Sequence, residues 1–505
     1  MASGPVDVVV VGGGNAGLCA ALSAREVAEK VLVLERAPLG EHGGNTTYTA
    51  GAMRVAYRGV EDILTLVPDL TPRQLEGTDF GSYPEEQFYD DMARVTEYRT
   101  DPELTHILVS RSRETLQWMR SKGVRFLPLY GRQAFEVDGK FTFWGGLTVE
   151  AHGGGPGLVD ALTKTVEREG IDIWYGARAA SLAVEDGTVI GVHVRRDRAE
   201  QVVRAGAVVL ASGGFESNVE WRTRYLGPGW DLAKVRGTRF NTGDGIRMAL
   251  DIGAVSWGQW SGAHAVAWDL NAPPFGDLAV GDGFQKHSYP FGIMVNGDGE
   301  RFVDEGADFR NYTYAKYGRE LLGQPGQFAW QVFDAKVSHL LRDEYRIRQA
   351  TKVTASTLEA LADKLDGVDP DRFLGTVRAY NAAVDQSVPF EPNVKDGRRT
   401  SGLAIDKSNW ANTIDEPPFE AYAVTCGITF TFGGLRITPR AEVVDTDEAV
   451  IPGLFACGEL VGGIFYFNYP GGAGLTNGSV FGRIAGRQAA SYVQSLVLPS
   501  SQSGG

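Results

Sequence analysis

A glycine-rich turn near the N-terminus has the residue types and spacing that bind the phosphates of a dinucleotide. Gly12, Gly14 and Gly17 form a GxGxxG pattern between the valine-rich run 6–11 and a helical pattern over 18–30. Glycines at these positions permit a tight turn and bring backbone N–H groups close to a pyrophosphate at the start of the helix. Glu35 ends the next apolar run, where a carboxylate can accept hydrogen bonds from ribose hydroxyls. The pattern predicts a βαβ unit that binds a dinucleotide.

A second glycine-rich region lies near the C-terminus. An apolar run ends in Glu459, and the glycine-rich segment 469–478 precedes a predicted helix over 479–490. Backbone N–H groups at such a helix start can contact O2 of a flavin ring. The carboxylate of Glu459 suits the hydroxyls of a ribityl chain. This second region favours FAD over NAD.

Several short motifs occur in the order of one known family. They are GGNT at 43–46, ASGGF at 211–215, TGDG at 242–245 and the two glycine-rich regions above. From about residue 6 to residue 490 the chain resembles the fumarate reductase/succinate dehydrogenase flavoprotein superfamily, which includes the 3-ketosteroid dehydrogenases. The resemblance implies an α/β fold with a split Rossmann-type FAD-binding domain, residues 1–256 and 415–492, and an inserted α+β capping domain, residues 257–414. Substrate is expected between the two domains, against the flavin.

The resemblance also implies which residues contact FAD. These are Gly12, Gly14, Asn15, Ala16, Gly17, Glu35, Arg36, Gly44, Asn45, Thr46, Gly51, Ala211, Gly213, Asp244, Gly458, Glu459, Gly474, Leu475 and Ser479. Family members with covalent flavin have a histidine at the position of Asn45, so the FAD is expected to be non-covalent. His42 lies close by and leaves a covalent link as the alternative.

The capping domain is expected to supply residues for the chemistry. The segment 296–310 resembles the fumarate reductase segment whose final arginine, here Arg310, transfers a proton. His264 stands where that family places a histidine that binds a substrate carboxylate. Phe430 and Tyr469 replace a second histidine and an arginine that bind the dicarboxylate. Fumarate and succinate are therefore not the expected substrates.

Two branches of the family leave two substrate classes open. Tyr469-Pro-Gly is similar to a segment of the ketosteroid dehydrogenases, in which a Tyr hydroxyl and a backbone N–H stabilise an enolate. Other stretches, among them 262–269 and 428–434, resemble the FAD-dependent tricarballylate dehydrogenases, which pass electrons to a membrane iron–sulfur partner. In that branch Arg54 and Arg58 are candidates to bind the additional carboxylates.

We therefore expect an FAD-dependent dehydrogenase that desaturates a C–C bond next to a carboxylate or carbonyl, with hydride passing to flavin N5. The expected substrate is a tricarballylate-like polycarboxylate. The alternatives are 1,2-desaturation of a cyclic ketone or ketosteroid, the reverse ene-reductase reaction, and an electron-transfer flavoprotein subunit. The expected catalytic residues are Arg310, Tyr469 and His264, and the expected substrate-binding residues are Arg54, Arg58, His287, Phe430 and Tyr466.

The sequence does not identify the general base, and the predicted catalytic residues also fit purely structural roles. Because arginine is first a proton donor, Tyr314 or Tyr466 is the candidate base in the oxidative direction. Arg310 has acidic neighbours at 304, 305 and 308 with which an ion pair is possible. His264 fits a core histidine equally well, and Tyr469 fits a residue that only caps its turn.

Composition limits the class of protein. The 505 residues carry a net charge of −14, which argues against nucleic acid as a partner because the phosphate backbone would be repelled. The three cysteines are far apart in the sequence, so neither an iron–sulfur cluster nor covalent haem nor another metal site is expected. Electrons must then pass to a quinone, a partner redox protein or O2. Apolar runs fall short of the ~20 residues of a membrane span and the N-terminus does not resemble a signal peptide, so a cytoplasmic protein is expected.

Apolar periodicity indicates that strands and helices alternate along the chain. Beyond the first βαβ unit, strands are expected at 171–174, 189–194, 207–211 and 453–457. Helices are expected at 103–122, 157–169, 245–252, 357–365 and 371–383. Residues 496–505, mostly Ser, Gly and Pro, are expected to form a disordered tail.

Overall fold

The first sheet brings the two ends of the chain together. In the computed structural model, which describes residues 5–143 and 146–497, its parallel strands run in the order β9-β2-β1-β12-β20. β11 pairs antiparallel with β10 and with the first half of β12, and β19 pairs with β20. The strands are β1 (Val6–Val11), β2 (Val31–Leu34), β9 (Asp172–Trp174), β10 (Arg178–Glu185), β11 (Thr188–Arg196), β12 (Ala199–Leu210), β19 (Glu442–Val444) and β20 (Val450–Ala456). β2 is buried along its whole length, as expected of a parallel strand covered on both faces.

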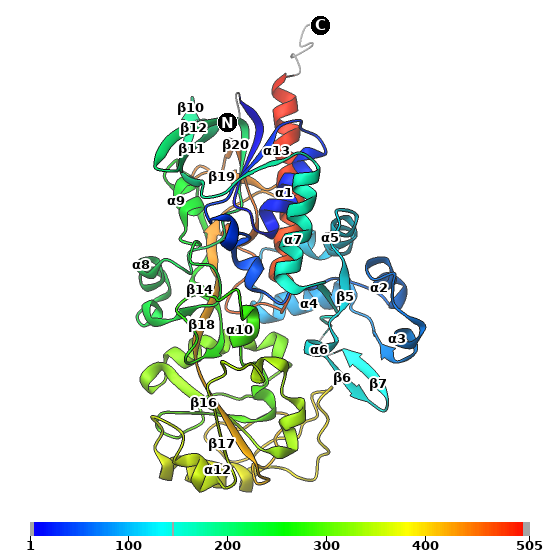
Figure 1. Cartoon of the computed structure of the whole chain (residues 1–505), viewed down its shortest axis with the longest axis vertical. Helices are drawn as coiled ribbons and strands as arrows, with labels where there is room; N and C mark the ends of the chain where they lie inside the picture. The colour runs from blue at the N-terminus through cyan, green and yellow to red at the C-terminus, as the bar shows by residue number, and fades with distance from the viewer. Residues whose placement is uncertain (1–4, 144–145, 498–505) are drawn as a thin grey trace.

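Helices α1 (Asn15–Arg25) and α13 (Ala473–Val497) lie side by side along this sheet, with α7 (Gly154–Arg168) next to α1 (Figure 1). Glycines permit the close approach of α1 and α13. A Cβ at Gly482 would lie 2.4 Å from the carbonyl oxygen of Ala16, and a Cβ at Gly486 would lie 2.0 Å from that of Ala20. The N-terminal and C-terminal helices are thus packed backbone against backbone.

The second sheet forms the core of the capping region. Its strands run in the order β13-β18-β16-β15, and β14 and β17 also pair with β18. They are β13 (Lys234–Val235), β14 (Ser256–Asp269), β15 (Ile293–Asn296), β16 (Phe328–Phe333), β17 (Lys352–Ala355) and β18 (Phe419–Leu435). β14 and β18 are long antiparallel partners that run from the first sheet down into the lower part of the molecule in Figure 1. The predicted domain boundaries at 256/257 and 414/415 remain a prediction, and β18 begins close to the second one.

Two small sheets and several helices form a side arm beside the first sheet (Figure 1). One small sheet has the order β3-β8-β5 and the other the order β4-β7-β6. The strands are β3 (Ala52–Met53), β4 (Thr78–Asp79), β5 (Phe126–Pro128), β6 (Ala134–Val137), β7 (Lys140–Phe143) and β8 (Val149–Ala151). The neighbouring helices are α2 (Val60–Leu66), α3 (Pro72–Glu76), α4 (Glu85–Val95), α5 (Pro102–Ser121) and α6 (Tyr130–Gln133).

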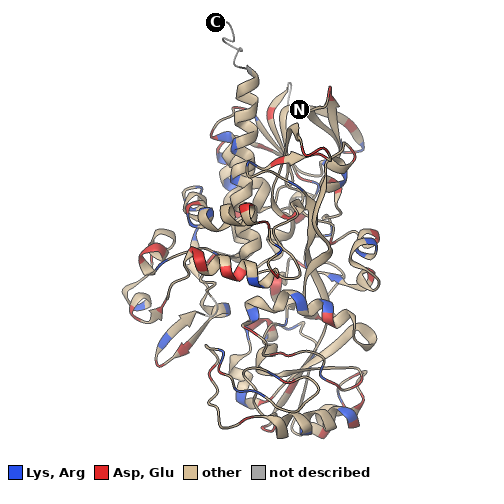
Figure 2. Cartoon of the chain, turned by 180° about the vertical axis from the view of Figure 1, so that it is seen from behind, with Lys and Arg blue, Asp and Glu red and all other residues tan. Residues whose placement is uncertain are grey.

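The remaining helices belong to the middle of the chain. They are α8 (Val219–Trp221), α9 (Asp244–Leu250), α10 (Tyr314–Leu322), α11 (Leu358–Ala362) and α12 (Pro370–Ala383). Lys and Arg (blue) and Asp and Glu (red) are mixed over all parts of the ribbon, and α4 is prominently acidic (Figure 2). Among the described residues, no helix is both long and apolar enough to cross a membrane.

The predicted α/β architecture is confirmed, but many elements were not predicted and the ends of several predicted ones are shifted. The first helix begins at Asn15 rather than at 18, and the last begins at Ala473 rather than at 479. Helices α4 and α10 and the strands of the second sheet were not predicted individually. Residues 496 and 497 of the predicted disordered tail belong to α13, and residues 498–505 lie outside the described residues.

Candidate functional site

One large pocket runs between the first sheet and the capping region. It has about 1840 Å³ of empty volume, including solvent at its mouth, and its wall extends from Gly12 and Glu35 to Tyr469 and Arg310. We call it the central pocket. Most residues predicted to contact FAD line it, namely Gly12, Gly14, Asn15, Ala16, Glu35, Arg36, Gly44, Asn45, Thr46, Ala211, Gly213, Asp244, Gly458, Glu459, Gly474 and Leu475.

The GxGxxG turn has the geometry that its glycines require. Gly12 has φ +113°, and a Cβ there would lie 2.4 Å from the carbonyl oxygen of Ala211. A Cβ at Gly17 would lie 1.9 Å from the carbonyl oxygen of Gly12, so this glycine closes the turn from behind without lining the pocket. Glu35 accepts hydrogen bonds from the backbone N–H of Gly13 at 2.9 Å and of Ala37 at 2.7 Å. The carboxylate is therefore fixed at the end of β2, beside the turn.

Gly51 and Ser479, also predicted to contact FAD, lie behind the pocket wall. Ser479 Oγ accepts a hydrogen bond from Asn15 Nδ2 at 2.9 Å, which joins α13 to the start of α1. Gly51 has φ +71°, and a Cβ there would lie 2.6 Å from the backbone of Gly154 at the start of α7. These two residues support the wall rather than form it.

The pocket wall leaves polar atoms that a dinucleotide would satisfy. Ser212 Oγ and Asn477 Oδ1 are buried in the wall and have no hydrogen-bond partner among the described residues. Gly474 and Leu475 place the first turn of α13 at the pocket, where backbone N–H groups and the helix dipole favour an electron-rich oxygen. The residues present therefore fit FAD, with Glu35 at the ribose, Gly13–Asn15 at the pyrophosphate and the start of α13 at the flavin ring.

Asn45 belongs to a buried amide and carboxyl cluster in the same wall. Its Nδ2 donates to Glu216 Oε1 and to the carbonyl oxygen of Thr429, both at 2.6 Å. Asn241 Nδ2 donates to Glu216 Oε1 at 2.7 Å and to Glu459 Oε2 at 3.5 Å. Burial, and then the neighbouring Glu459, raise the pKa of Glu216 well above its ordinary value. The prediction missed Glu216 and Asn241, although Glu216 directly follows the ASGGF motif.

Aromatic rings form the wall around Tyr469. The hydroxyls of Tyr469 and Tyr314 form a short hydrogen bond, and both residues line the pocket with Phe430. His264 lies behind them, with its ring centroid 4.8 Å from that of Tyr469 and 5.2 Å from that of Phe430. Burial raises the pKa of both tyrosines, and the adjacent Tyr469 raises that of Tyr314 further. His264 is completely buried and does not line the pocket, so it supports Tyr469 and Phe430 from behind.

Arg310 lies in the capping-region wall beside His287. Its Nη1 is 3.3 Å from Nδ1 of His287, and its Nη2 donates to the backbone carbonyl of Arg132 at 2.7 Å. A guanidinium has donors only, so Nδ1 of His287 is the acceptor and the ring proton is on Nε2. Burial, and then Arg310, lower the pKa of His287 well below its ordinary value, in agreement with a neutral ring. Arg310 and His287 thus form one polar unit at the pocket.

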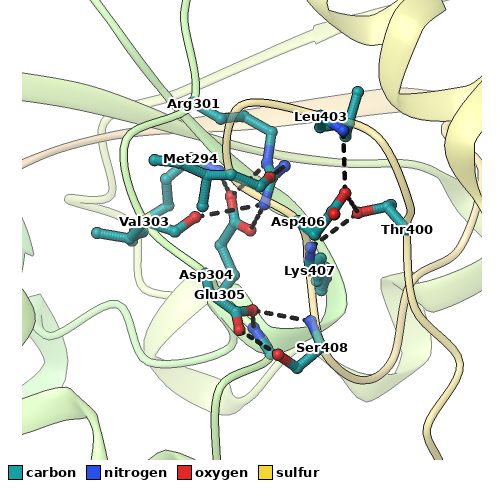
Figure 3. A network of polar contacts seen from close by, with 12 residues as sticks. Met294, Arg301, Val303, Asp304, Glu305, Thr400, Leu403, Asp406, Lys407 and Ser408 are labelled. Atoms are coloured by element: carbon teal, nitrogen blue, oxygen red, sulfur yellow. Dashed lines mark hydrogen bonds and ion pairs between the residues drawn. The ribbon is translucent and has the colours of Figure 1, made fainter.

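The segment that precedes Arg310 is anchored by a buried polar network (Figure 3). Glu305 accepts from Arg301 Nη2 at 2.5 Å and from the backbone N–H of Met294 at 2.8 Å. Asp304 accepts from the backbone N–H of Ser408 at 3.0 Å. The third acidic neighbour, Asp308, pairs with Arg94 at 2.6 Å. The three carboxylates considered as ion-pair partners of Arg310 are thus each bound to another residue.

Three predicted substrate-binding residues do not reach the central pocket. Arg54 is completely buried and lies 3.7 Å from Asp91, with its guanidinium 5.2 Å from the ring centroid of Tyr312. Arg58 is on the surface, where 74% of its side chain is exposed and its guanidinium lies 4.0 Å from the carboxylate of Glu86. Tyr466 does not line the pocket either. The sequence missed Arg132 and Arg236, which do line it.

Comparisons with known proteins agree with this site. The profile of the FAD binding domain family matches residues 7–475. A fumarate reductase (cytochrome) of Shewanella frigidimarina is 31% identical over 500 residues, which are 97% of this chain and 79% of the relative. A 3-oxosteroid 1-dehydrogenase of Mycolicibacterium smegmatis is 26% identical, over 95% of this chain and 96% of the relative.

A solved structure shows the same fold. The open conformation of a flavocytochrome c3 fumarate reductase superposes with a TM-score of 0.71 at 29% identity, and it covers 97% of this chain and 79% of that one. The predicted family and the FAD cofactor are confirmed by these matches. The chain belongs to the fumarate reductase/succinate dehydrogenase flavoprotein superfamily and is an FAD-dependent oxidoreductase acting on CH–CH groups.

Proposed function

We propose that the enzyme adds or removes two hydrogens across the C–C bond next to the carbonyl of a ketone, and that Tyr469 binds the carbonyl oxygen. The observation that carries this proposal is the hydrogen bond between the Tyr469 and Tyr314 hydroxyls inside an aromatic wall. Bound FAD supplies the two-electron acceptor or donor for this chemistry. Asn45, whose amide is engaged on both sides, supports non-covalent FAD.

Tyr469 and Tyr314 have different roles in the proposed reaction. A phenol hydroxyl that donates to a ketone oxygen stabilises the enolate that forms when the α-proton leaves, and this acidifies that proton. Tyr314 is in hydrogen-bond contact with Tyr469, and so is placed to take the α-proton during desaturation and to return it during reduction. Tyr466, the other candidate base, is absent from the pocket wall, which favours Tyr314. Arg310 supplies positive charge at the same wall and can donate a proton in the reductive direction.

The two arginines predicted to bind the additional carboxylates of a polycarboxylate do not reach the pocket. Of the arginines predicted to bind carboxylates, Arg54 is engaged inside the protein and Arg58 is on the surface. A tricarballylate-like substrate is the second candidate, because Arg310 does line the pocket. An electron-transfer subunit without a substrate is disfavoured, since such a subunit has no need of a pocket with paired tyrosines. The proposal includes an electron acceptor, which is a quinone, a partner redox protein or O2, and does not choose among the three.

Anaerobic spectroscopy of the holoenzyme near 450 nm tests the proposal in both directions. A cyclic ketone or a 3-ketosteroid should bleach the oxidised flavin, or the matching enone should restore the colour of the reduced flavin. Tyr469→Phe should slow the reaction by about 10²–10³-fold, as for the loss of an oxyanion donor. Reaction with tricarballylate and not with any ketone or enone would overturn it.

A further inference from the structure

The capping-region wall of the central pocket is rich in hydrogen-bond donors. Arg132, Arg236, Arg310 and His287 line it, and we call these four residues the donor wall. They come from distant parts of the chain: Arg132 from α6 of the side arm, Arg236 from the residue after β13, and the other two from the capping region. In a chain with a net charge of −14, three arginines gathered at one pocket wall suggest that the wall faces an anion.

One carboxylate faces this wall, and its acceptor capacity is already used. Asp282 Oδ1 accepts from Arg236 Nε at 2.8 Å and pairs with Arg236 Nη2 at 2.6 Å. Asp282 Oδ2 accepts from Arg132 Nη1 at 2.9 Å and from Gln285 Nε2 at 2.6 Å. One negative charge is therefore shared between two guanidinium groups, and Arg132 is joined to it through a single N–H group.

Arg132 keeps contact with the interior of the pocket. Its side chain is 29% exposed, against 8% for Arg236, although both bind Asp282. Its backbone carbonyl accepts the hydrogen bond from Arg310 Nη2, so the side arm and the capping region meet at this residue. Of the two guanidinium groups that bind Asp282, that of Arg132 is therefore the more accessible to a ligand in the pocket.

His287 supplies a second donor. Because its Nδ1 accepts from Arg310, its Nε2 carries a proton. This nitrogen is buried, the residue is only 1% exposed, and Nε2 has no hydrogen-bond partner among the described residues. A buried donor without an acceptor destabilises the empty site, and a ligand oxygen that accepts from it would remove that cost.

The charged groups packed behind the donor wall do not cancel its positive charge. Arg342 lies close to Arg310 and Arg132, and burial together with these two cations lowers its pKa to about 9. Glu344 is buried nearby and offsets part of the positive charge. Lys286 is 3.8 Å from Asp269, so that pair contributes little net charge. Glu150, beside Arg132, is largely buried, and burial raises its pKa to about 7.

We propose that Arg132 and His287 bind a carboxylate carried by the substrate, at a subsite separate from the carbonyl held by Tyr469. This inference rests on the proposed function and narrows its substrate to a keto acid or its unsaturated counterpart. A carboxylate is favoured because its two oxygens match the planar guanidinium and can accept from His287 Nε2 as well. A substrate carboxylate would add a second anion beside Arg132 and Arg236, which share the single carboxylate of Asp282.

Equilibrium dialysis of the holoenzyme against radiolabelled benzoate and benzamide tests this subsite without requiring turnover. The two ligands have the same shape and differ in charge. We expect benzoate to bind at least fivefold more tightly than benzamide. Arg132→Gln should reduce this preference to less than twofold by weakening benzoate alone, whereas Arg132→Lys should retain part of it.

The control is Arg58→Gln, which removes the same charge from the surface and should leave the preference unchanged. His287→Phe provides an independent variant if Arg132→Gln fails to retain FAD, and it should weaken benzoate but not benzamide. Equal binding of the two ligands by the wild-type protein would overturn the subsite. So would a preference for benzoate that Arg132→Gln or, in its place, His287→Phe leaves intact.

The two proposals fail separately. If neutral ketones react in a Tyr469-dependent way while benzoate and benzamide bind equally, the function stands and the carboxylate subsite falls. If benzoate binding depends on Arg132 but Tyr469→Phe reacts like the wild-type protein, the subsite stands and the ketone chemistry falls.

Discussion

Arg54 Nε donates a hydrogen bond to the carbonyl oxygen of Gly471 at 2.8 Å. A completely buried arginine in the N-terminal part of the chain thereby fixes the glycine pair that leads into α13. The backbone of Arg54 reinforces the link, since its N–H donates to the carbonyl of Gly472 at 3.1 Å. Arg54 thus holds the Tyr469 loop and positions it without reaching the pocket.

We expect Arg54→Met to destabilise the protein strongly. The substitution would remove the buried cation beside the carboxylate of Asp91, only 3% exposed, and leave it the partly exposed Arg94 at 3.3 Å. Loss of one member of a buried pair costs about 3–5 kcal/mol in the free energy of unfolding. Arg58→Met is the matched control and should change it by less than about 0.5 kcal/mol, because Arg58 is exposed. Urea titration followed by circular dichroism measures both, and similar losses would contradict this role of Arg54.

Gly17→Ala should abolish most FAD binding. The added Cβ would lie 1.9 Å from the carbonyl oxygen of Gly12 and would force the phosphate-binding turn open. Affinity should fall by more than about tenfold, or ~1.4 kcal/mol. Gly40→Ala is the control, since no atom lies within 4 Å of a Cβ at that position. The ratio of flavin to protein absorbance after purification reports the difference, and full FAD content in Gly17→Ala would refute the expectation.

If Tyr314 is the base, as proposed, the desaturation rate should rise with pH. Its pKa is raised well above the ordinary value by burial and by Tyr469, so the deprotonated fraction increases about tenfold per pH unit over pH 7–9. Tyr314→Phe should remove this slope and lower the rate by about 10²–10⁴-fold. Stopped-flow reduction of the flavin by a ketone measures the profile. An unchanged slope in the variant would assign the base elsewhere.

His287 should make the folded state sensitive to acid. Its pKa is lowered in the folded protein, so the unfolded chain binds the proton more readily, and stability falls as pH drops below the unfolded value of about 6.5. His287→Gln removes this group. Between pH 7.5 and 5.5 the wild-type thermal midpoint should therefore fall further than that of the variant. Parallel curves for the two proteins would show that His287 does not titrate in this way.

Short sequence motifs were enough to predict the FAD-binding part of the central pocket. The GxGxxG turn, Glu35 and the start of α13 lie within short segments whose geometry glycine and apolar periodicity largely determine. The chemistry of the capping region depended on long-range packing instead. Arg54 and Arg58 are four residues apart in the sequence, yet only Arg54 meets Asp91 and becomes buried.

Other residues escaped prediction because their partners are far away in the sequence. Arg132 meets Asp282 and Arg310 only after the side arm has folded against the capping region. Glu216 accepts a hydrogen bond from the distant Asn45, and its pKa is raised by burial and by the distant Glu459. An isolated arginine or glutamate carries no spacing pattern, so the sequence alone cannot distinguish these positions from surface charges.

The contact between α1 and α13 has a consequence for biosynthesis. Gly486, which packs on the backbone of Ala20, is made roughly 470 residues after it. At about 5–20 residues per second, the face of α1 stays uncovered for roughly 25–90 s of translation. The strand neighbours β12 and β20 meet after roughly half that delay, because the capping region is made between them. The nascent chain therefore exposes an apolar, incomplete nucleotide-binding fold during this interval, and the FAD pocket can close only once the start of α13, which lines it, has left the exit tunnel.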